Sequence, residues 1–176
     1  MSNLKKESLH KNNNRCYLKS GIINEPENKI RPDYHPGYQG IKCRVYLVRE
    51  NNVNEQIKIS NSEDAYDLVK AELINMDREV MLSILLTPQN TLIGVETVCI
   101  GSVQSCAFST AEVFKGALLA NAVSVVLCHN HPSGSLSPST EDLKVTELMA
   151  EAGKILGIRV LDHIIVTQEG YKSLYD

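Results

Sequence analysis

The sequence predicts an α/β domain in which a mixed central sheet is flanked by helices. Two kinds of segment alternate along the chain. Short apolar runs have the alternation or length of strands, and longer segments have apolar residues at helical spacing. The order of these segments, β-α-β-β-α-β-α-β, contains no internal repeat, as expected for helices packed on a mixed sheet. A chain of 176 residues with 43% hydrophobic residues can bury one core but not two.

The first part of the chain differs in composition from the rest. Residues 1–40 are poor in aliphatic side chains and rich in Asn, Lys, Pro and Gly, so they bury too little apolar surface to offset the entropy of ordering. We expect residues 1–40 to form a flexible polar arm and residues 41–176 to form the domain. Alternating residues predict its first strand over residues 41–48, an edge at which a second chain could pair. The sequence leaves the oligomeric state open.

A first helix is predicted over residues 61–76, behind a Ser62 cap and an acidic first turn. Its expected buried face comprises Ala65, Leu68, Val69, Leu73 and Met76. Two apolar runs follow, over residues 79–87 and 91–102. Because the turn residues Pro88, Gln89 and Asn90 separate them, these runs predict an antiparallel hairpin.

A second helix is predicted over residues 109–122, where Ser109 and Glu112 have the spacing of a capping box. Its expected buried stripe comprises Val113, Phe114, Ala117 and Leu118. The Val-rich run over residues 123–131 has the pattern of a central strand covered on both faces.

A third helix is predicted over residues 139–157, ended by Gly157 in the left-handed conformation. Its expected inward residues are Val145, Leu148, Met149, Ala152, Ile155 and Leu156. A last strand is predicted over residues 158–167, and the remaining residues are expected to trail off.

Charge and composition exclude several classes of protein. The formal net charge of −3 gives no electrostatic footprint for nucleic acid, and the basic cluster in the arm is expected to be a solvated tail. No apolar run approaches the roughly 18 residues that span a bilayer, and the N-terminus lacks the apolar region of a signal peptide. The five cysteines include no C-x-x-C pair, so we expect reduced thiols. Together these features predict a cytoplasmic protein without a membrane partner.

The stretch LCHNHPSGSLSPSTED, residues 127–142, predicts a metal site. Because strand side chains alternate, His129 and His131 leave the sheet on the same face. The Gly- and Ser-rich loop then lets Asp142, in the first turn of the next helix, approach the same point. Two imidazole nitrogens and a carboxylate oxygen suit zinc and leave a fourth position for water, which is the catalytic pattern. Zinc lowers the pKa of such a water from about 15.7 to about 7.

Each signal also has a simpler interpretation. Ser139 and Asp142 after Pro138 have the spacing of an ordinary capping box, and a lone His-x-His at a strand end is more often a polar rim. Their occurrence in one connection favours a metal. A hydrolytic site also needs a base, for which Glu79 is favoured slightly over Glu96, since alternation turns Glu96 toward solvent.

The spacing His-x-His, seven residues, Ser, two residues, Asp is the JAMM (MPN-plus) metalloprotease motif, and the text from about Ser62 to Thr167 resembles the JAMM domain of the bacterial RadC family. The resemblance implies a JAMM/MPN-like (cytidine-deaminase-like) fold and a zinc-dependent peptidase or isopeptidase that acts on a protein or peptide. It implies zinc held by His129, His131 and Asp142. It implies Glu79 as the general base and Ser139 as the group that steadies the oxyanion.

Two other functions stay open at this stage. One is a DNA-repair or other nucleic-acid accessory protein with a structural or vestigial metal site. The other is a module that binds a protein tail without cleaving it. A core or sheet-edge role is favoured for His163 in the last strand, over a role in orienting a metal ligand.

Overall fold

The structure, a computed structural model, describes residues 56–101 and 109–175. Over these residues a single sheet runs in the order β2-β1-β3-β4-β5. The elements are α1 (Ser62–Leu73), β1 (Val80–Leu86), β2 (Leu92–Ile100), α2 (Thr110–Leu119), β3 (Ser124–Asn130), α3 (Thr140–Leu156), β4 (Arg159–Thr167) and β5 (Gly170–Ser173). The predicted arm over residues 1–40 and the predicted strand over residues 41–48 lie outside the described residues.

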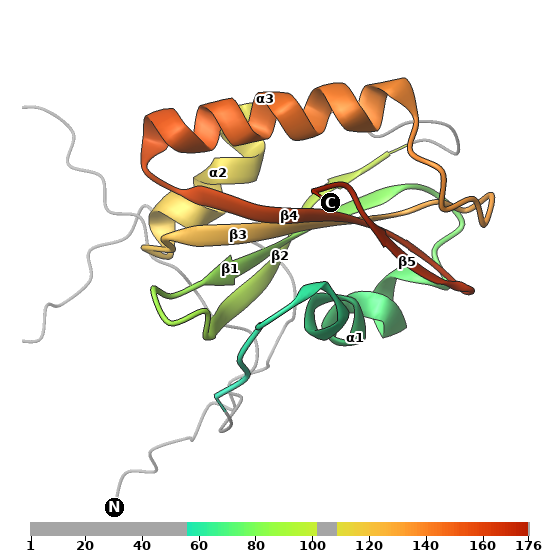
Figure 1. Ribbon diagram of the computed structural model, residues 1–176, viewed down its shortest axis with the longest axis horizontal. Coiled ribbons are helices and arrows are strands. Elements are labelled where there is room, and N and C mark those ends of the chain that lie inside the picture. The colour runs from blue at the N-terminus through green and yellow to red at the C-terminus, as the bar shows by residue number, and fades with distance from the viewer. Residues whose placement is uncertain (1–55, 102–108, 176) are drawn as a thin grey trace, which may run out of the picture. The chain divides into compact units, whose positions relative to one another are not determined.

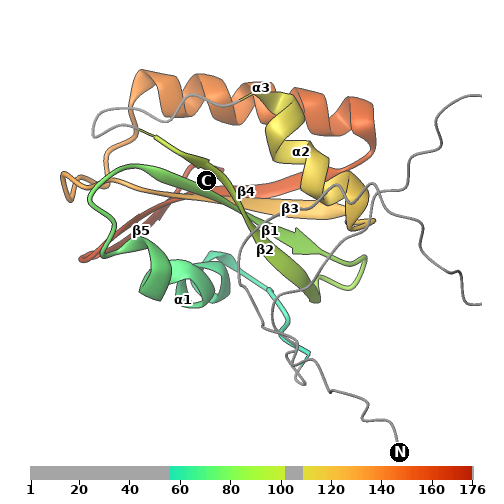
Figure 2. The same cartoon turned by 180° about the vertical axis from the view of Figure 1, so that it is seen from behind.

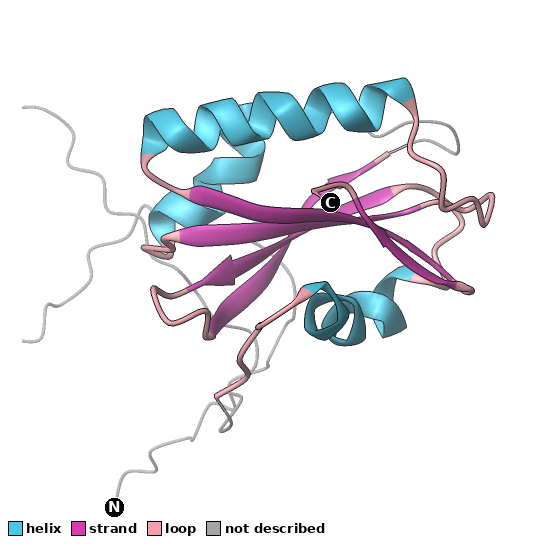
Figure 3. Ribbon diagram, in the orientation of Figure 1, coloured by secondary structure: helices cyan, strands magenta, loops and turns pink. Residues whose placement is uncertain are grey.

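Helices cover both faces of the sheet. In Figures 1 and 2, α1 lies on one face, and α2 and α3 lie on the other. The secondary-structure colouring of Figure 3 shows the sheet as the middle layer between them. β1 pairs with β2 and β3 in antiparallel fashion, β3 and β4 are parallel across α3, and β5 returns antiparallel to β4. The predicted mixed sheet flanked by helices is therefore confirmed.

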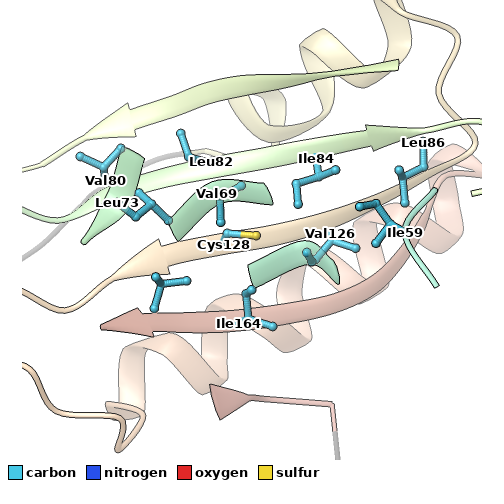
Figure 4. Close-up of a cluster of buried hydrophobic side chains, with 12 residues drawn as sticks. Ile59, Val69, Leu73, Val80, Leu82, Ile84, Leu86, Val126, Cys128 and Ile164 are labelled. Atoms are coloured by element: carbon cyan, nitrogen blue, oxygen red, sulfur yellow. The ribbon is translucent and has the colours of Figure 1, made fainter. Parts of the chain in front are cut away.

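The core on the α1 face joins α1 to the three inner strands. Figure 4 shows its side chains reaching from β1, β3 and β4 toward α1. The cluster includes Val69 and Leu73 of α1 together with the strand residues Leu82, Ile84, Leu86, Val126, Cys128 and Ile164. Because strand side chains alternate, the residues between them point to the opposite core under α2 and α3. β1 and β3 are buried along their whole length, which confirms that the Val-rich run is a central strand.

Local signals at helix ends are mostly confirmed. Ser109 and Glu112 form the predicted capping box of α2, and Gly157 ends α3 with a φ of 71°. The Ser62 cap is wrong by one residue, because Asn61 accepts the hydrogen bond from the amide of Asp64. Ser62 instead begins the helix and donates its hydroxyl hydrogen to Asp162.

Several residues predicted to lie inward are exposed. They are Met76, Leu118, Leu148, Ile155 and Leu156. The helix α3 turns toward the sheet the narrower face that carries Thr146, Met149 and Gly153. Leu148 and Ile155 lie at least 100° around the helix from each of these three residues, since 100° separates successive residues of a helix. Met76 follows the end of α1, and so the helical spacing no longer applies to it.

Two further expectations need correction. The C-terminal residues do not trail off, because β5 pairs with β4 from Ile164 to Thr167. Cys99 is disulfide-bonded, so the expectation of reduced thiols is wrong there, whereas Cys128 is a free and buried thiol. In the described part of the chain, none of the helices has the length and apolar character needed to cross a membrane.

Candidate metal centre

Three candidate ligands meet where β3 ends and α3 begins. Nε2 of His129 lies 3.0 Å from Nε2 of His131. The carboxylate of Asp142 approaches both rings, with Oδ1 at 3.3 Å from His129 Nε2 and Oδ2 at 3.4 Å from His131 Nε2. One ligand atom from each residue lies within 4.8 Å of the others, so the structure brings the predicted set together.

Strand alternation explains why the two histidines share a face. Cys128 points into the core under α1, and the side chain of Asn130 bonds to the backbone beside β1. The loop after β3 then fixes the second ring, because His131 Nδ1 lies 2.7 Å from the carbonyl oxygen of Ser135. Gly134 makes this turn possible with a φ of +77°, a conformation that side chains with a Cβ rarely adopt. A carbonyl only accepts, so His131 Nδ1 holds a hydrogen and neutral His131 presents a bare Nε2.

The capping box of α3 holds the third ligand. The amide of Ser139 donates to Asp142 Oδ2 at 2.7 Å, and the amide of Asp142 donates to Ser139 Oγ at 3.1 Å. Asp142 therefore belongs both to the capping box of α3 and to the group with His129 and His131. The cap holds Oδ2 of Asp142 through the Ser139 amide and so orients the carboxylate with Oδ2 toward His131 and Oδ1 toward His129.

Charges in the centre shift its proton affinities strongly. The hydrogen bond to Asp142 raises the pKa of His131 against the effect of burial, and the negative charge of Glu79 acts in the same direction. Burial opposes ionisation of Asp142, but the neighbouring rings of His129 and His131 and the cap from Ser139 outweigh it and lower the pKa of this carboxyl. The site therefore holds an ionised carboxylate beside two imidazole rings, and this carboxylate favours a positive charge on His131.

The donor set fits a zinc-like ion. Two ligand atoms bound to a tetrahedral zinc at about 2.1 Å lie roughly 3.4 Å apart, close to the spacings in this centre. Imidazole and carboxylate ligands suit zinc better than they suit magnesium or calcium, which prefer oxygen. Nε2 of His129 and Nε2 of His131 face each other at 3.0 Å, and two ring nitrogens without hydrogens repel each other at this distance unless a cation lies between them.

Glu79 lies immediately before β1, beside the centre. The strand register pairs Met81 with His129, which brings Glu79 opposite His131 two residues further along. Its neighbours are held by Asn130, whose Oδ1 accepts from the amide of Val80 at 2.7 Å and whose Nδ2 donates to the carbonyl of Arg78 at 2.9 Å. Asn130 thus clamps the backbone on both sides of Glu79. Sequence reasoning missed this clamp, although an amide between two ligand histidines was the available signal.

The alternative base, Glu96, lies elsewhere and is not turned to solvent as predicted. It is partly buried opposite Ser83, under α2, where a Cβ on Gly116 would overlap its carboxylate. Burial raises the pKa of Glu96, while the charge of Lys115 opposes the shift. Glu96 is not part of the His129, His131 and Asp142 group.

His163 contacts a candidate ligand directly. Its Nε2 lies 2.8 Å from His129 Nδ1, and its Nδ1 lies 2.7 Å from the hydroxyl of Thr146. The ring is fully buried, and burial lowers the pKa of His163 to about 3. His163 is thus a core residue, as favoured, and is also in contact with His129. The parallel register of β3 and β4, which the sequence does not specify, creates this contact.

A cavity of about 430 Å³ meets the metal group at His131 alone, since neither His129 nor Asp142 lines it. Its walls come from the end of α1 and residues 74–76, from residues 130–134, and from the turn over residues 166–169. His131 is therefore shared between the metal group and the cavity.

Comparison with known proteins shows the family to which this chain belongs. The family model described as a RadC-like JAB domain matches residues 59–176. The chain belongs to the RadC-like JAB domain family. The match includes every residue of the metal group together with Glu79, Ser139 and His163, and it confirms the family resemblance seen in the motif.

Relatives in this family are similar over the same region. A UPF0758 protein of Rubrobacter xylanophilus is 47% identical over 116 residues, which cover 66% of this chain and 51% of the relative. A UPF0758 protein of Methanosarcina barkeri is 43% identical over 119 residues, 68% and 52% of the two chains. A third, of Caldanaerobacter subterraneus, is 41% identical over 129 residues, 72% and 55% of the two chains. The chain spans about half the length of these curated relatives, whose names state no activity.

Proposed function

We propose that this RadC-like JAB domain is a zinc-dependent hydrolase of the JAMM type that cleaves an amide or isopeptide bond in a protein or peptide. The observation that supports this most directly is the convergence of His129, His131 and Asp142 on one point, with ligand atoms within 4.8 Å of one another. Three protein ligands leave a position open for a reactant, as in catalytic rather than structural zinc sites.

His129 and His131 would hold the ion through Nε2, and Asp142 through its carboxylate. When bound, the ion supplies Lewis-acid activation of water and of the amide carbonyl. The preference for zinc rests on the mixed nitrogen and oxygen donors and on their spacing.

Glu79 is the proposed general base. Its charge reaches His131, so the carboxylate lies close to the centre without belonging to the metal group. In this role Glu79 takes one proton from the attacking water as the new carbon–oxygen bond forms. It then delivers that proton to the leaving nitrogen as the carbon–nitrogen bond breaks, which yields an acid and an amine.

Ser139 is the proposed donor to the developing oxyanion. Its Oγ accepts from the amide of Asp142, and none of the bonds found among the described residues uses its hydroxyl hydrogen. The side chain is exposed beside the ligand that it caps. A hydroxyl held in this way can donate to negative charge on the carbonyl oxygen without losing its role in the cap.

The proposed substrate is a protein or peptide rather than nucleic acid. The cavity that His131 lines could receive a segment of polypeptide that extends beyond the metal group, whose other members, His129 and Asp142, do not line it. The net charge of −3 gives no support to binding of a polyanion.

The test compares two variants of the full chain with the wild type. Glu79→Gln should keep zinc at wild-type stoichiometry and lose about 100-fold to 10,000-fold in turnover, the usual contribution of a general base. Asp142→Ala should lose both zinc and turnover. Zinc is measured by elemental analysis after dialysis, and turnover by profiling new amine termini and released lysine amines in a proteome. Glu147→Gln, an exposed residue of α3, is the matched control.

Two outcomes would contradict the proposal. Wild-type protein that retains no divalent metal would remove the metal centre. Identical terminal profiles for wild type and Glu79→Gln, with zinc bound in both, would remove the hydrolase while leaving a metal-binding protein.

A further inference from the structure

A buried row of polar side chains leads from β3 to the first turn of α3. It consists of His129, His163 and Thr146, and it ends at the carbonyl oxygen of Asp142. His163 is fully buried, and His129 and Thr146 are exposed by only 4% and 7%. In such a row each contact needs one donor and one acceptor, because water cannot supply a missing hydrogen-bond partner. The positions of the ring and hydroxyl hydrogens are therefore linked along the row.

The direction of the row is fixed at its Thr146 end. The Thr146 hydroxyl lies 2.6 Å from the carbonyl oxygen of Asp142, which can only accept, so the single hydroxyl hydrogen is used there. Toward His163 Nδ1, at 2.7 Å, the same oxygen must therefore act as an acceptor. It follows that His163 Nδ1 holds a hydrogen.

The same assignment of donors and acceptors extends to His129. With a hydrogen on Nδ1, the neutral His163 ring has a bare Nε2, which accepts from His129 Nδ1 at 2.8 Å. His129 then holds its hydrogen on Nδ1 and leaves Nε2 bare. That is the nitrogen that faces His131 and Asp142.

We propose that His163 and Thr146 are positioning residues that select the Nδ1–H tautomer of His129 and fix its ring, so that Nε2 is ready to bind the metal. The inference rests on the metal centre proposed above. The row ends at the backbone of Asp142, whose side chain supplies another ligand, so a ligand on β3 and a ligand on α3 are oriented through one connected network. Histidine ligands usually donate their second N–H to a carboxylate or a carbonyl, whereas here the acceptor is a neutral imidazole.

The alternative is that His163 only fills the core. A filler needs volume but no particular hydrogen-bond direction, so a purely structural role predicts that stability, not metal affinity, depends on the Thr146 hydroxyl. The two roles therefore separate in a measurement that reads the His129 ring itself.

The first experiment measures ring tautomers in the metal-free wild type. Long-range ¹H–¹⁵N correlation spectra of histidine-labelled protein distinguish protonated from bare ring nitrogens. We expect Nδ1–H for both His129 and His163. An Nε2–H tautomer of His129 would overturn the inference, and this result needs no variant to fold.

The second experiment measures zinc affinity by chelator competition in folded variants. Thr146→Val keeps the shape but removes the hydroxyl, and we expect an affinity loss of about 10-fold to 100-fold, the usual effect of losing a partner beyond the ligands. Thr146→Ser should restore most of the affinity. Ser62→Ala is the matched control, because it removes a hydroxyl bond of the same 2.6 Å length on the opposite face of the sheet and should keep wild-type affinity.

The outcomes separate the two proposals. Wild-type protein without affinity for zinc would overturn the metal centre and the inference together. Wild-type zinc affinity in Thr146→Val would overturn the role of Thr146 and His163 while the metal centre stands. An equal loss in Ser62→Ala would also overturn it, because the effect would then follow from stability alone.

Discussion

Asp162 and His163 are neighbours on β4, but their side chains leave opposite faces of the sheet and enter different polar clusters. On the α1 face, Asp162 accepts from Ser62 Oγ at 2.6 Å, from Ser173 Oγ at 2.8 Å and from the amide of His163 at 2.7 Å. On the other face, His163 lies in the middle of the row between Thr146 and His129, and Nε2 of His129 faces the candidate metal centre.

The two clusters differ in whether each acceptor atom receives a hydrogen bond. Around Asp162 the neighbouring hydroxyls and an amide supply a donor for each oxygen, so the cluster is complete and joins α1, β4 and β5. Around His129 and His131 the neighbours use the Nδ1 hydrogens and leave the Nε2 lone pairs without a donor. A closed cluster of this kind stabilises the fold, whereas an open one needs a cation to complete it.

The largest effect on stability is expected from breaking the closed cluster. Asp162→Ala leaves the hydroxyls of Ser62 and Ser173 without their acceptor and detaches the start of α1 from β4 and β5. Because the bonds go to a buried carboxylate, we expect a loss of about 3 kcal/mol in the free energy of unfolding, with zinc affinity unchanged. Urea denaturation and chelator competition measure the two quantities.

The matched control is Asp67→Ala, which removes an exposed acid that pairs with Lys70 on the surface of α1. Surface pairs contribute little, so its stability should change by under about 1 kcal/mol. If Asp162→Ala lowered zinc affinity as much as Thr146→Val does, the two faces would not be independent. The contrast between the two clusters would then fail.

An intermediate effect is expected at Asn130, which faces away from the histidines yet holds the backbone around Glu79. Asn130→Ala leaves the buried amide of Val80 without a partner, so we expect a loss of about 2 kcal/mol in stability. Turnover should fall by up to about 100-fold because Glu79 is no longer held in place, whereas zinc affinity should change little. Thermal unfolding, terminal profiling and chelator competition together test this pattern.

Asn130→Asp refines that test. The carboxylate keeps an acceptor for the amide of Val80 but loses the donor to the carbonyl of Arg78. Stability should recover more than turnover if the position of Glu79 depends on both bonds. Full turnover in either variant would show that the clamp does not position Glu79.

The sequence was sufficient for those features that depend on local chemistry. Period-two alternation placed His129 and His131 on one face, and the capping-box spacing placed Asp142 in the first turn of α3. The metal-binding motif could therefore be predicted from the sequence. The hairpin and the capping box of α2 were readable for the same reason.

Features set by tertiary contacts were not predictable. The pairing of Leu127 with His163 depends on the register of β3 and β4, which no local pattern states. The burial of Glu96 depends on the close approach of α2 at Gly116, and β5 depends on the edge offered by β4. The exposed Leu148 and Ile155 show that helical spacing alone does not fix which face of α3 packs on the sheet.

The smallest effect is expected at Glu96, an open polar group outside the metal centre. Its Oε2 is buried and has no hydrogen-bond partner in the described part of the chain, as is also true of Ser83 Oγ. Burial raises the pKa of Glu96 in the folded state above the ordinary value of 4.5. The fold therefore favours the neutral acid, so the stability of the wild type should decline as pH rises from the unfolded pKa through the folded pKa, and should then stay level.

Glu96→Gln removes that decline, because the amide keeps the shape of the acid and cannot ionise. The variant should be more stable at neutral pH by under about 1 kcal/mol, since solvent still screens part of the side chain. Glu112→Gln is the control of opposite sign. The pKa of Glu112 is lowered by hydrogen bonds from Ser109, so its carboxylate contributes stability above the unfolded pKa that is lost as pH falls. Urea midpoints from pH 4 to neutrality measure both slopes. If stability depended on pH in Glu96→Gln as it does in the wild type, a buried polar atom without a hydrogen-bond partner would have no energetic cost on this face. Ring nitrogens without a hydrogen-bond donor would then be no sign of a metal site at the histidine pair.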